Sequence, residues 1–335
     1  MPSNVVELDN LSVLMIWTAV AIYAVAFLVY VFDLARRAQA SADARLVRSQ
    51  QREAVVAGGV GSGAGVAREE PAAPAQPGVN KLARIATALT ALAVLFHLAG
   101  TVLRGIAAER VPWSNMHEFA MTGTVLITIV YLLVNIKYDL KFLGTFITGL
   151  VVVLLGGSAV AFYVTVAPLA DPLRSVWLVI HVFVATLATA FFALACSLSI
   201  LQLLQARREA KKIADASALK KSFLDTLPTA DTLEGLAYRF SIIGFILWTF
   251  TLIAGSIWAN DAWGRYWGFD TKEVWTFVIW VLYAGYIHAR STRGWRGNRS
   301  AWLSIVGFSA VLFNFTIVNI FFKGLHAYSG LTTAN

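Results

Sequence analysis

The stretch Phe142–Val164 reads FLGTFITGLVVVLLGGSAVAFYV and contains no charged residue. An apolar run of about 20 residues is long enough to cross the roughly 30 Å hydrocarbon core of a membrane as a helix. Similar runs occur along the whole chain, at Leu11–Leu34, Leu82–Leu103, Phe119–Ile136, Val176–Leu204, Phe240–Trp258, Thr271–Ala289 and Ala301–Phe322. The sequence therefore predicts an all-α protein, a polytopic membrane helical bundle of about eight transmembrane helices.

The composition excludes several classes of protein. Of the 335 residues, 58% are hydrophobic and 14% are charged, whereas a soluble domain has about 45–50% apolar and about 25% charged residues. These values exclude a soluble enzyme, a disordered chain and a secreted disulfide scaffold. The one cysteine, Cys196, cannot form an internal disulfide or supply a Cys-x-x-Cys-His haem attachment site, so the chain is not itself a c-type cytochrome.

The basic residues indicate how the helices are oriented. If Met1 lies on the outer side, 21 of the 27 Lys and Arg residues fall in inner segments or at their edges, as the positive-inside rule requires. An even number of spans then puts both termini on the outer side. The net charge of +8 is thereby explained by topology, and no nucleic-acid partner is needed to account for it.

Composition also divides the chain into segments. Residues 1–34 are predicted to form the first transmembrane helix, 35–81 a flexible cytoplasmic linker, and 82–335 a seven-helix domain. The linker contains GGVGSGAG and PAAPAQP, which cannot build a core. GGVGSG resembles part of a phosphate loop, but no Lys-Ser/Thr follows it. The first span also has the position of a cleaved signal, although its length and the spans that follow favour a retained helix.

One predicted outer loop is unusually aromatic. The segment from Trp258 to Trp275 reads WANDAWGRYWGFDTKEVW. An interfacial belt of aromatic residues is one interpretation, but a belt would be spread over many helix ends. Large flat faces concentrated on a glycine-containing backbone favour a platform for a large flat ligand. Asp270 and Glu273 have the spacing of a capping box, which would fix the platform to the next helix rather than act as an acid–base pair.

Two of the five histidines flank this platform in sequence and are predicted on the same side of the membrane. His181 lies in the outer part of the fifth span, and His326 lies just beyond the eighth. Two neutral imidazoles that approach a plane from opposite sides are the arrangement required for axial ligation of haem iron. The alternatives are an interhelical structural histidine for His181 and an exposed tail histidine for His326.

The other three histidines have less clear roles. His288 is predicted near the inner end of the seventh span, either as an interfacial residue beside Arg290 or as half of an inner ligand pair completed by another protein. His97 and Arg104 share a helix face, and Arg104 could hold an acidic group of a ligand. Structural support is an equal alternative for His97 and for His117.

Other chemistries find little support. The chain has no HExxH, GxSxG or Walker pattern and no pair of carboxylates within a span. A b-type electron-transfer cytochrome remains an alternative, but such proteins usually carry histidines about 13–14 residues apart on paired helices. The histidines here are separated by 20, 64, 107 and 38 residues.

The segment Trp263–Trp275 resembles the tryptophan-rich WWD signature of the haem-handling proteins of cytochrome c maturation. With its length and eight predicted spans, the chain resembles the CcsA/ResC family of system II, often labelled CcsB in actinobacteria. Pro112-Trp-Ser-Asn-Met-His-Glu118 is similar to the family's Pro-x-Ser-Asn-x-x-Glu loop, and Trp177–Ala195 to its first histidine helix. Phe269 and Thr271 depart from the family pattern, which usually has Trp and Pro there.

This resemblance implies a function and a set of sites. The chain would be the integral membrane haem-handling subunit of a cytochrome c synthase in the cell membrane, holding haem b as a transported substrate for thioether attachment to the CxxCH site of apocytochrome c. His181 and His326 would bind haem iron at the outer site and His288 at an inner site, whose second ligand would come from a ResB/Ccs1-like partner. Thiol-reducing proteins would be involved indirectly. A carrier or exporter of the CcmC-like type without synthase activity is the alternative. Further cofactor-binding candidates are Trp263, Tyr266, Trp267, Phe269, Asp270, Trp275, Arg104 and His97.

Overall fold

A computed structural model describes residues 3–58, 79–166, 175–214, 222–292, 294–322 and 324–325, with side chains described from residue 3 to 40 and from 81 onward within these ranges. All of the regular structure in these ranges is helical, which confirms the all-α prediction. The elements are α1 (Ser3–Gly58), α2 (Val79–Ala108), α3 (Met116–Lys137), η1 (Lys141–Leu143), α4 (Gly144–Val151), η2 (Val152–Gly156), α5 (Gly157–Ala161), α6 (Val176–Ala214), η4 (Phe223–Thr226), α7 (Ala230–Trp263), α8 (Thr271–Ser291), α9 (Asn298–Phe315) and α10 (Ile317–Phe321).

Seven helical segments of the described chain are long and apolar enough to cross a membrane. They are α1, α2, α3, the continuous run from η1 to α5, α6, α7, and α9 together with α10. The seventh predicted span, Thr271–Ala289, forms helix α8 of 21 residues but is not among them. Its Trp, Tyr, His and charged residues make it less apolar than the others, and it nevertheless packs against α7 and α9 within the same bundle.

The structure differs from the prediction of a flexible linker that begins at residue 35. Helix α1 continues to Gly58 instead. The physical reason is composition, because residues 41–56 are rich in Ala, Arg, Leu, Gln and Glu, which favour helix. The Gly- and Pro-rich part of the predicted linker, residues 59–78, lies outside the described residues.

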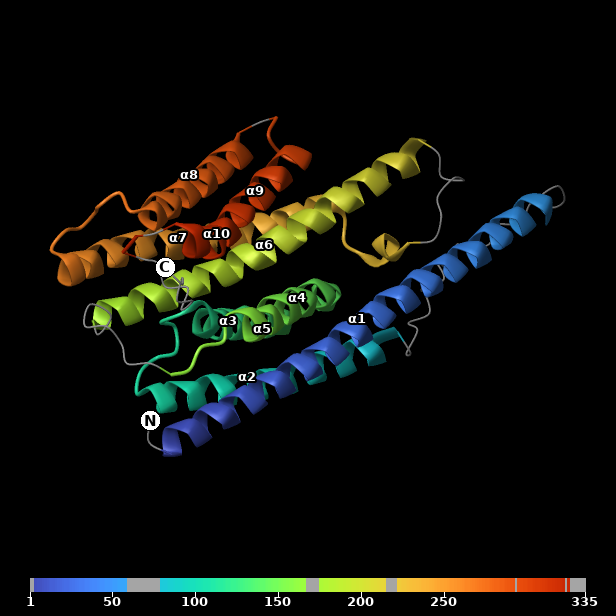
Figure 1. The fold of residues 1–335 in the computed structure, drawn as a ribbon. Helices are drawn as coiled ribbons and strands as arrows, with labels where there is room; N and C mark the ends of the chain where they lie inside the picture. The colour runs from blue at the N-terminus through green and yellow to red at the C-terminus, as the bar shows by residue number, and fades with distance from the viewer. Residues whose placement is uncertain are drawn as a thin grey trace.

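The helices lie in layers (Figure 1). The α1–α2 pair packs on α3 and α4, these pack on α6, and α6 packs on α7 and α9. Fully buried alanines, among them Ala19, Ala26, Ala83, Ala86 and Ala93, line the helices of the first pair. Small residues allow transmembrane helices to approach closely. Helices α1 and α8 begin, and α2 and α7 end, toward one end of the bundle, which we call the loop end.

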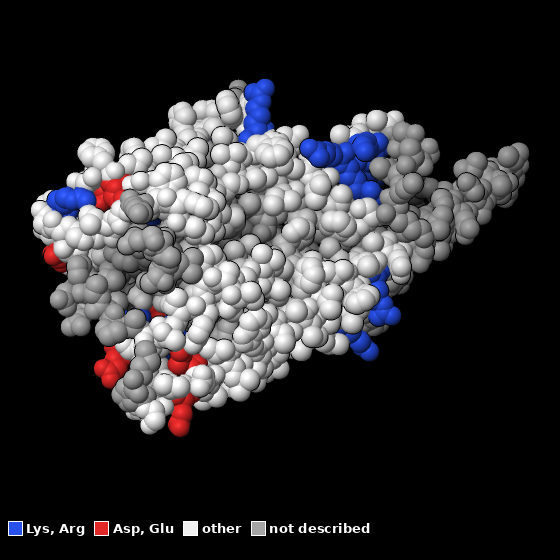
Figure 2. All heavy atoms as spheres, in the orientation of Figure 1, with Lys and Arg blue, Asp and Glu red and all other residues white. Residues whose placement is uncertain are grey.

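The distribution of surface charge matches a membrane bundle. On the face seen in Figure 2, acidic side chains gather at the loop end and most basic ones toward the opposite ends of the helices. The wall between them, as far as the structure describes it, is formed by uncharged residues. Large apolar side chains are exposed on the helices, as lipid-facing positions require; examples are Phe32, Leu95, Val160 and Ile246.

Candidate functional site

The connection between α7 and α8 is held at both ends. Helix α7 ends at Trp263 because Gly264 adopts a left-handed conformation (φ 67°) and its N–H bonds the carbonyl of Asn260 at 2.9 Å. Helix α8 begins with a capping box formed by Asp270 and Glu273, which confirms the capping that the sequence predicted. We call the intervening segment, Gly264–Asp270, the aromatic loop.

Glu273 fixes the aromatic loop through its backbone. Its buried carboxylate accepts hydrogen bonds from the N–H of Gly268 at 2.7 Å and from that of Asp270 at 3.2 Å. Two aromatic side chains of the loop are left exposed: Tyr266 is 62% and Phe269 80% exposed. Phe269 also has a φ of 57°, a conformation that is rare for residues with a side chain. Glu273 thus fixes the backbone of the loop, whereas the side chains of Tyr266 and Phe269 remain exposed.

His181, near the start of α6, is held against α7. Its ring is stacked on that of Trp258, with the ring centroids 6.0 Å apart and the planes at 20°. Its Nδ1 lies 2.9 Å from the carbonyl oxygen of Thr251. Because a carbonyl can only accept, Nδ1 carries the proton and Nε2 carries the lone pair. Histidines that bind metals usually donate their other ring N–H to a carbonyl or carboxylate in this way.

A glycine makes this position possible. A Cβ on Gly255 would lie 2.6 Å from Cε1 and 2.8 Å from Nδ1 of His181. A glycine at this turn of α7 therefore allows the imidazole to lie directly against the helix backbone.

Two neighbouring cavities meet at His181. The larger lies between α3, α6, α7, α8 and α9 and has an empty volume of about 1340 Å³ when its open mouth is included. The smaller, about 480 Å³ on the same measure, is bordered by Tyr266 and Trp267 of the aromatic loop. Ligand sites are usually concave and mostly apolar, with few polar groups. Four residues line both cavities: His181, Trp258, Lys272 and Thr276.

The structure brings some of the predicted platform residues to these cavities. Tyr266 and Trp267 line the smaller one together with His181. Trp263 instead packs edge-to-face on Trp258, with centroids 4.7 Å apart, and so supports the cavity wall. Trp275 lines neither cavity as described, because it packs on Phe313 of α9 at 4.4 Å.

Of the two other predicted haem ligands, His288 is described by the structure and lies away from this site. His288 lies near the far end of α8, where its side chain is exposed. His326 lies outside the described residues. Its role therefore stays a prediction.

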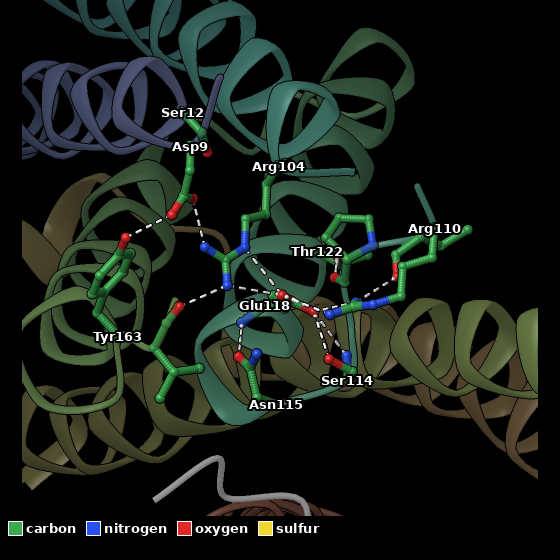
Figure 3. A network of polar contacts seen from close by, with 12 residues as sticks. Asp9, Ser12, Arg104, Arg110, Ser114, Asn115, Glu118, Thr122 and Tyr163 are labelled. Atoms are coloured by element: carbon green, nitrogen blue, oxygen red, sulfur yellow. Dashed lines mark hydrogen bonds and ion pairs between the residues drawn. The ribbon is translucent and has the colours of Figure 1, made fainter. Parts of the chain in front are cut away.

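Arg104 belongs to a buried polar network at the loop end (Figure 3). Its Nε donates to Glu118 at 3.0 Å, its Nη1 to Asp9 at 2.5 Å and its Nη2 to the Val164 carbonyl at 2.7 Å. Arg110 donates to the other oxygen of Glu118 at 2.6 Å. Arg104 is 1% exposed, so its guanidinium has protein partners where the sequence suggested an acidic group of a ligand.

The remaining hydrogen bonds of the network fix the segment that leads into α3. Asn115 caps α3 by accepting from the N–H of Glu118 at 2.9 Å, and Ser114 donates to the Glu118 carboxylate through both its N–H and its hydroxyl at 3.0 Å. Tyr163 donates to Asp9 at 2.7 Å (Figure 3). Burial, followed by this hydrogen bond to a carboxylate, raises the pKa of the Tyr163 phenol above its usual value. We call the segment Pro112–Glu118 the clasp.

His97 and His117 line neither of the two cavities. His97 is fully buried, and its Nδ1 lies 3.4 Å from the hydroxyl of Tyr23. His117 is 3% exposed and makes an edge contact with the ring of Tyr163 at 5.5 Å. Both positions match the structural alternative considered for these histidines.

Sequence reasoning missed two residues of the cavities. Lys272 lies within the aromatic motif, and its Nζ donates to Oδ1 of Asn319 at 2.5 Å. Neither residue had a local signal in the sequence, because the contact that brings them together joins positions 47 apart in the chain.

Architecture and site together define a class: a multi-pass helical membrane protein with an aromatic, histidine-containing cavity at one end of its bundle. Comparison with known proteins identifies the family within this class. Residues 113–326 match the model of the cytochrome c assembly protein family, and the chain belongs to this family. The matched region contains all of the clasp except Pro112, and also His181 and the aromatic loop.

Individual relatives agree with this assignment. The chain is 32% identical over 271 residues to the cytochrome c biogenesis protein CcsA of Synechococcus sp. (strain CC9902), an alignment that covers 76% of this chain and 87% of the relative. Identity to CcsA of Guillardia theta is 34% over 244 residues, 68% of this chain and 80% of the relative. For CcsA of Porphyra purpurea it is 30% over 290 residues, 77% and 90%. The predicted membership of the CcsA family of system II is thereby confirmed, and the chain is a membrane protein of cytochrome c biogenesis.

Proposed function

We propose that this chain is the integral haem-handling subunit of a system II cytochrome c synthase and that it holds haem b, its substrate, in the cavities beside His181. The observation that carries the proposal is the geometry of His181. Its Nδ1–H is bonded to a backbone carbonyl, and the ring borders two connected cavities below the aromatic loop. That tautomer gives Nε2 the lone pair that haem iron requires.

The surroundings of His181 suit a large flat ring. Trp113, Phe119, Trp248 and Phe315 add aromatic faces to the larger cavity. Burial of apolar surface contributes about 25 cal/mol per Å², and stacking on aromatic rings adds to this. Binding would therefore depend mainly on the ring system, while His181 sets the position of the iron.

The proposed reaction adds the two cysteine thiols of an apocytochrome CxxCH motif to the two haem vinyl groups. In each addition the thiol sulfur bonds one vinyl carbon, the thiol hydrogen passes to the other, and the vinyl double bond becomes single. No electrons are gained or lost. The chain contributes by positioning the haem. A macrocycle held in a fixed orientation at the loop end presents its vinyl groups to the cysteine thiols in a geometry that favours the addition.

The predicted second outer ligand is His326, on the opposite side of the ring from His181. The incoming histidine of the CxxCH motif would displace one of these ligands and release the product. His288 would bind haem at an inner site whose other ligand comes from a ResB/Ccs1-like membrane protein. The exposed side chain of His288 at the far end of α8 is compatible with such a shared site. We place the complex in the cell membrane, with both termini of the chain on the outer side.

The test is replacement of His181 with and without a soluble substitute ligand. The full chain would be co-expressed with a ResB-like partner and a reporter apocytochrome, and His181→Ala compared with His117→Ala. We expect His181→Ala to lose the bis-histidine spectrum of bound haem and covalent haem on the reporter, and imidazole in the medium to restore both in part. His117→Ala should keep both, because His117 lines neither cavity as described.

Two outcomes would contradict the proposal. Unchanged haem content, spectrum and reporter maturation in His181→Ala would remove His181 from the site. Secretion of free haem by the wild type, with no covalent haem on the reporter, would instead support a haem carrier.

A further inference from the structure

Lys272 places a cation at the junction of the two cavities. It lies in the first turn of α8 and lines both cavities together with His181. In the part of the chain that the structure describes, no carboxylate oxygen lies within 4.0 Å of its Nζ, although Asp270 attracts the ammonium from a greater distance. The guanidinium groups of Arg104 and Arg290, by contrast, each contact a carboxylate.

Asn319 holds the ammonium in place without neutralising it. Its Oδ1 accepts from Nζ of Lys272 at 2.5 Å, and its Nδ2 donates to the Phe315 carbonyl at 2.8 Å. The second bond fixes the orientation of the amide, so that its oxygen faces the lysine. A neutral acceptor of this kind positions a cation and leaves its charge available for an anion.

A cation in a mostly apolar cavity is costly unless an anion joins it. The same low-dielectric surroundings strengthen its attraction for a carboxylate. The cavity around Lys272 therefore has the chemistry of a site for a ligand that is largely apolar and aromatic but carries a carboxylate.

We propose that Lys272 binds a propionate carboxylate of the macrocycle and so selects acidic porphyrins over neutral ones. This inference rests on the proposed function, since it assumes that the cavities hold haem. In haem b the two propionates are attached at one edge of the ring, and the two vinyl groups are attached away from that edge. Anchoring a propionate at Lys272 therefore also determines which edge of the ring is presented to the cysteine thiols.

The experiment compares haem with its dimethyl ester, which has the same ring and iron but no carboxylate. Both would be titrated against the purified full-length chain in detergent micelles, with binding followed by the Soret band. We expect the wild type to bind haem about ten- to a hundredfold more tightly than the ester, as a hydrogen bond to a charged group implies. Lys272→Met should bind the two equally, with its affinity for the ester unchanged.

Two further variants separate this role from a general effect on folding. Asn319→Asp supplies the ammonium with a carboxylate of its own and keeps the lysine, so it should also abolish the preference for haem. Lys141→Met is the matched control, because Lys141 pairs with the exposed Asp139 away from the cavities. It should leave both affinities unchanged.

The outcomes distinguish the two proposals. A wild type that binds neither porphyrin would overturn the proposed function. A wild type that binds both equally, or a Lys272→Met variant that keeps the preference, would overturn the role of Lys272 alone. Loss of affinity for both porphyrins to the same degree would indicate a structural role for the lysine and would also contradict the proposal.

Discussion

The clasp and the aromatic loop both lead into a helix at the loop end, and both use an acid three residues after the cap. Glu118 of the clasp donates its N–H to Asn115 and turns its carboxylate to two arginines and a serine. Glu273 turns its carboxylate back to the backbone of the aromatic loop. One arrangement buries its carboxylates and Arg104. The other fixes the loop mainly through its backbone, with one ion pair to Arg265 at 3.7 Å, and leaves Tyr266 and Phe269 exposed.

This difference separates support from binding. A buried ion cluster is rigid because breaking it leaves a charge without a partner. A loop whose backbone alone is fixed keeps its side chains available to a ligand. Arg104 lies in the first kind of region, whereas Tyr266, Trp267 and His181 lie at the second. We therefore expect the aromatic loop to contribute mainly to ligand contact and the clasp mainly to stability, although Trp113 of the clasp also lines the larger cavity.

Removing the charge at the centre of the clasp should have the largest effect. Glu118→Gln leaves Arg104 and Arg110 without their shared carboxylate and should lower the free energy of unfolding by about 3–5 kcal/mol. Thermal unfolding in micelles would measure it. Glu109→Gln, at an exposed position nearby, should unfold like the wild type. Equal stability of the two variants would contradict the role given to the clasp.

The aromatic loop side of the comparison is tested by moving His181 without replacing it. Gly255→Ala puts a Cβ against the imidazole, and overpacking of this kind costs about 1–3 kcal/mol. We expect roughly tenfold weaker haem binding and an altered Soret band, with a smaller change in stability. Gly285→Ala is the control, because nothing lies within 4 Å of a Cβ there. Identical titration curves for both variants would remove Gly255 from the site.

The anchor of the aromatic loop should contribute less. Asp270→Ala removes one half of the capping box and should lower the free energy of unfolding by about 1 kcal/mol. Haem binding should weaken less than in Gly255→Ala, because the hydrogen bond from the N–H of Gly268 to Glu273 still holds the loop. Asp261→Ala, at an exposed position near the end of α7, provides the comparison in the same denaturation experiment. If Asp270→Ala lowered the free energy of unfolding as much as Glu118→Gln, the aromatic loop would contribute to stability as strongly as the clasp, which would contradict the comparison.

The two regions also differ in how far the sequence could predict them. The capping box at Asp270 and Glu273 depends on residues three apart, and a local pattern sufficed to predict it. The apolar runs similarly predicted the helices, because hydrophobic length is a property of each segment alone. α8 is the exception in hydropathy, because its Trp, Tyr, His and charged residues make the segment less apolar than the other spans.

The contacts of the clasp could not be predicted in this way. Arg104 pairs with Asp9 across 95 positions of sequence, and a single sequence contains no signal for such a pair. An arginine near the end of a span is equally suited to a ligand and to a buried acid. Burial decides between them, and burial depends on the packing of α1 against α2. Lys272 and Asn319 were missed for the same reason.

The smallest effect is expected where the clasp network reaches its edge. Tyr163→Phe removes the hydroxyl that donates to Asp9 and should lower the free energy of unfolding by about 1 kcal/mol. The pKa of this phenol is raised in the folded protein, so the protonated form is the one that folding favours. The contribution of Tyr163 is therefore fully present below the unfolded pKa of about 10 and is lost as the pH rises through the higher folded value. Denaturation of the two proteins should differ by a constant amount from pH 7 to 9 and converge at more alkaline pH. A difference that grows with alkalinity would mean that the phenolate is stabilised in the folded chain, by Arg104 for example, and that Asp9 does not set the properties of this edge.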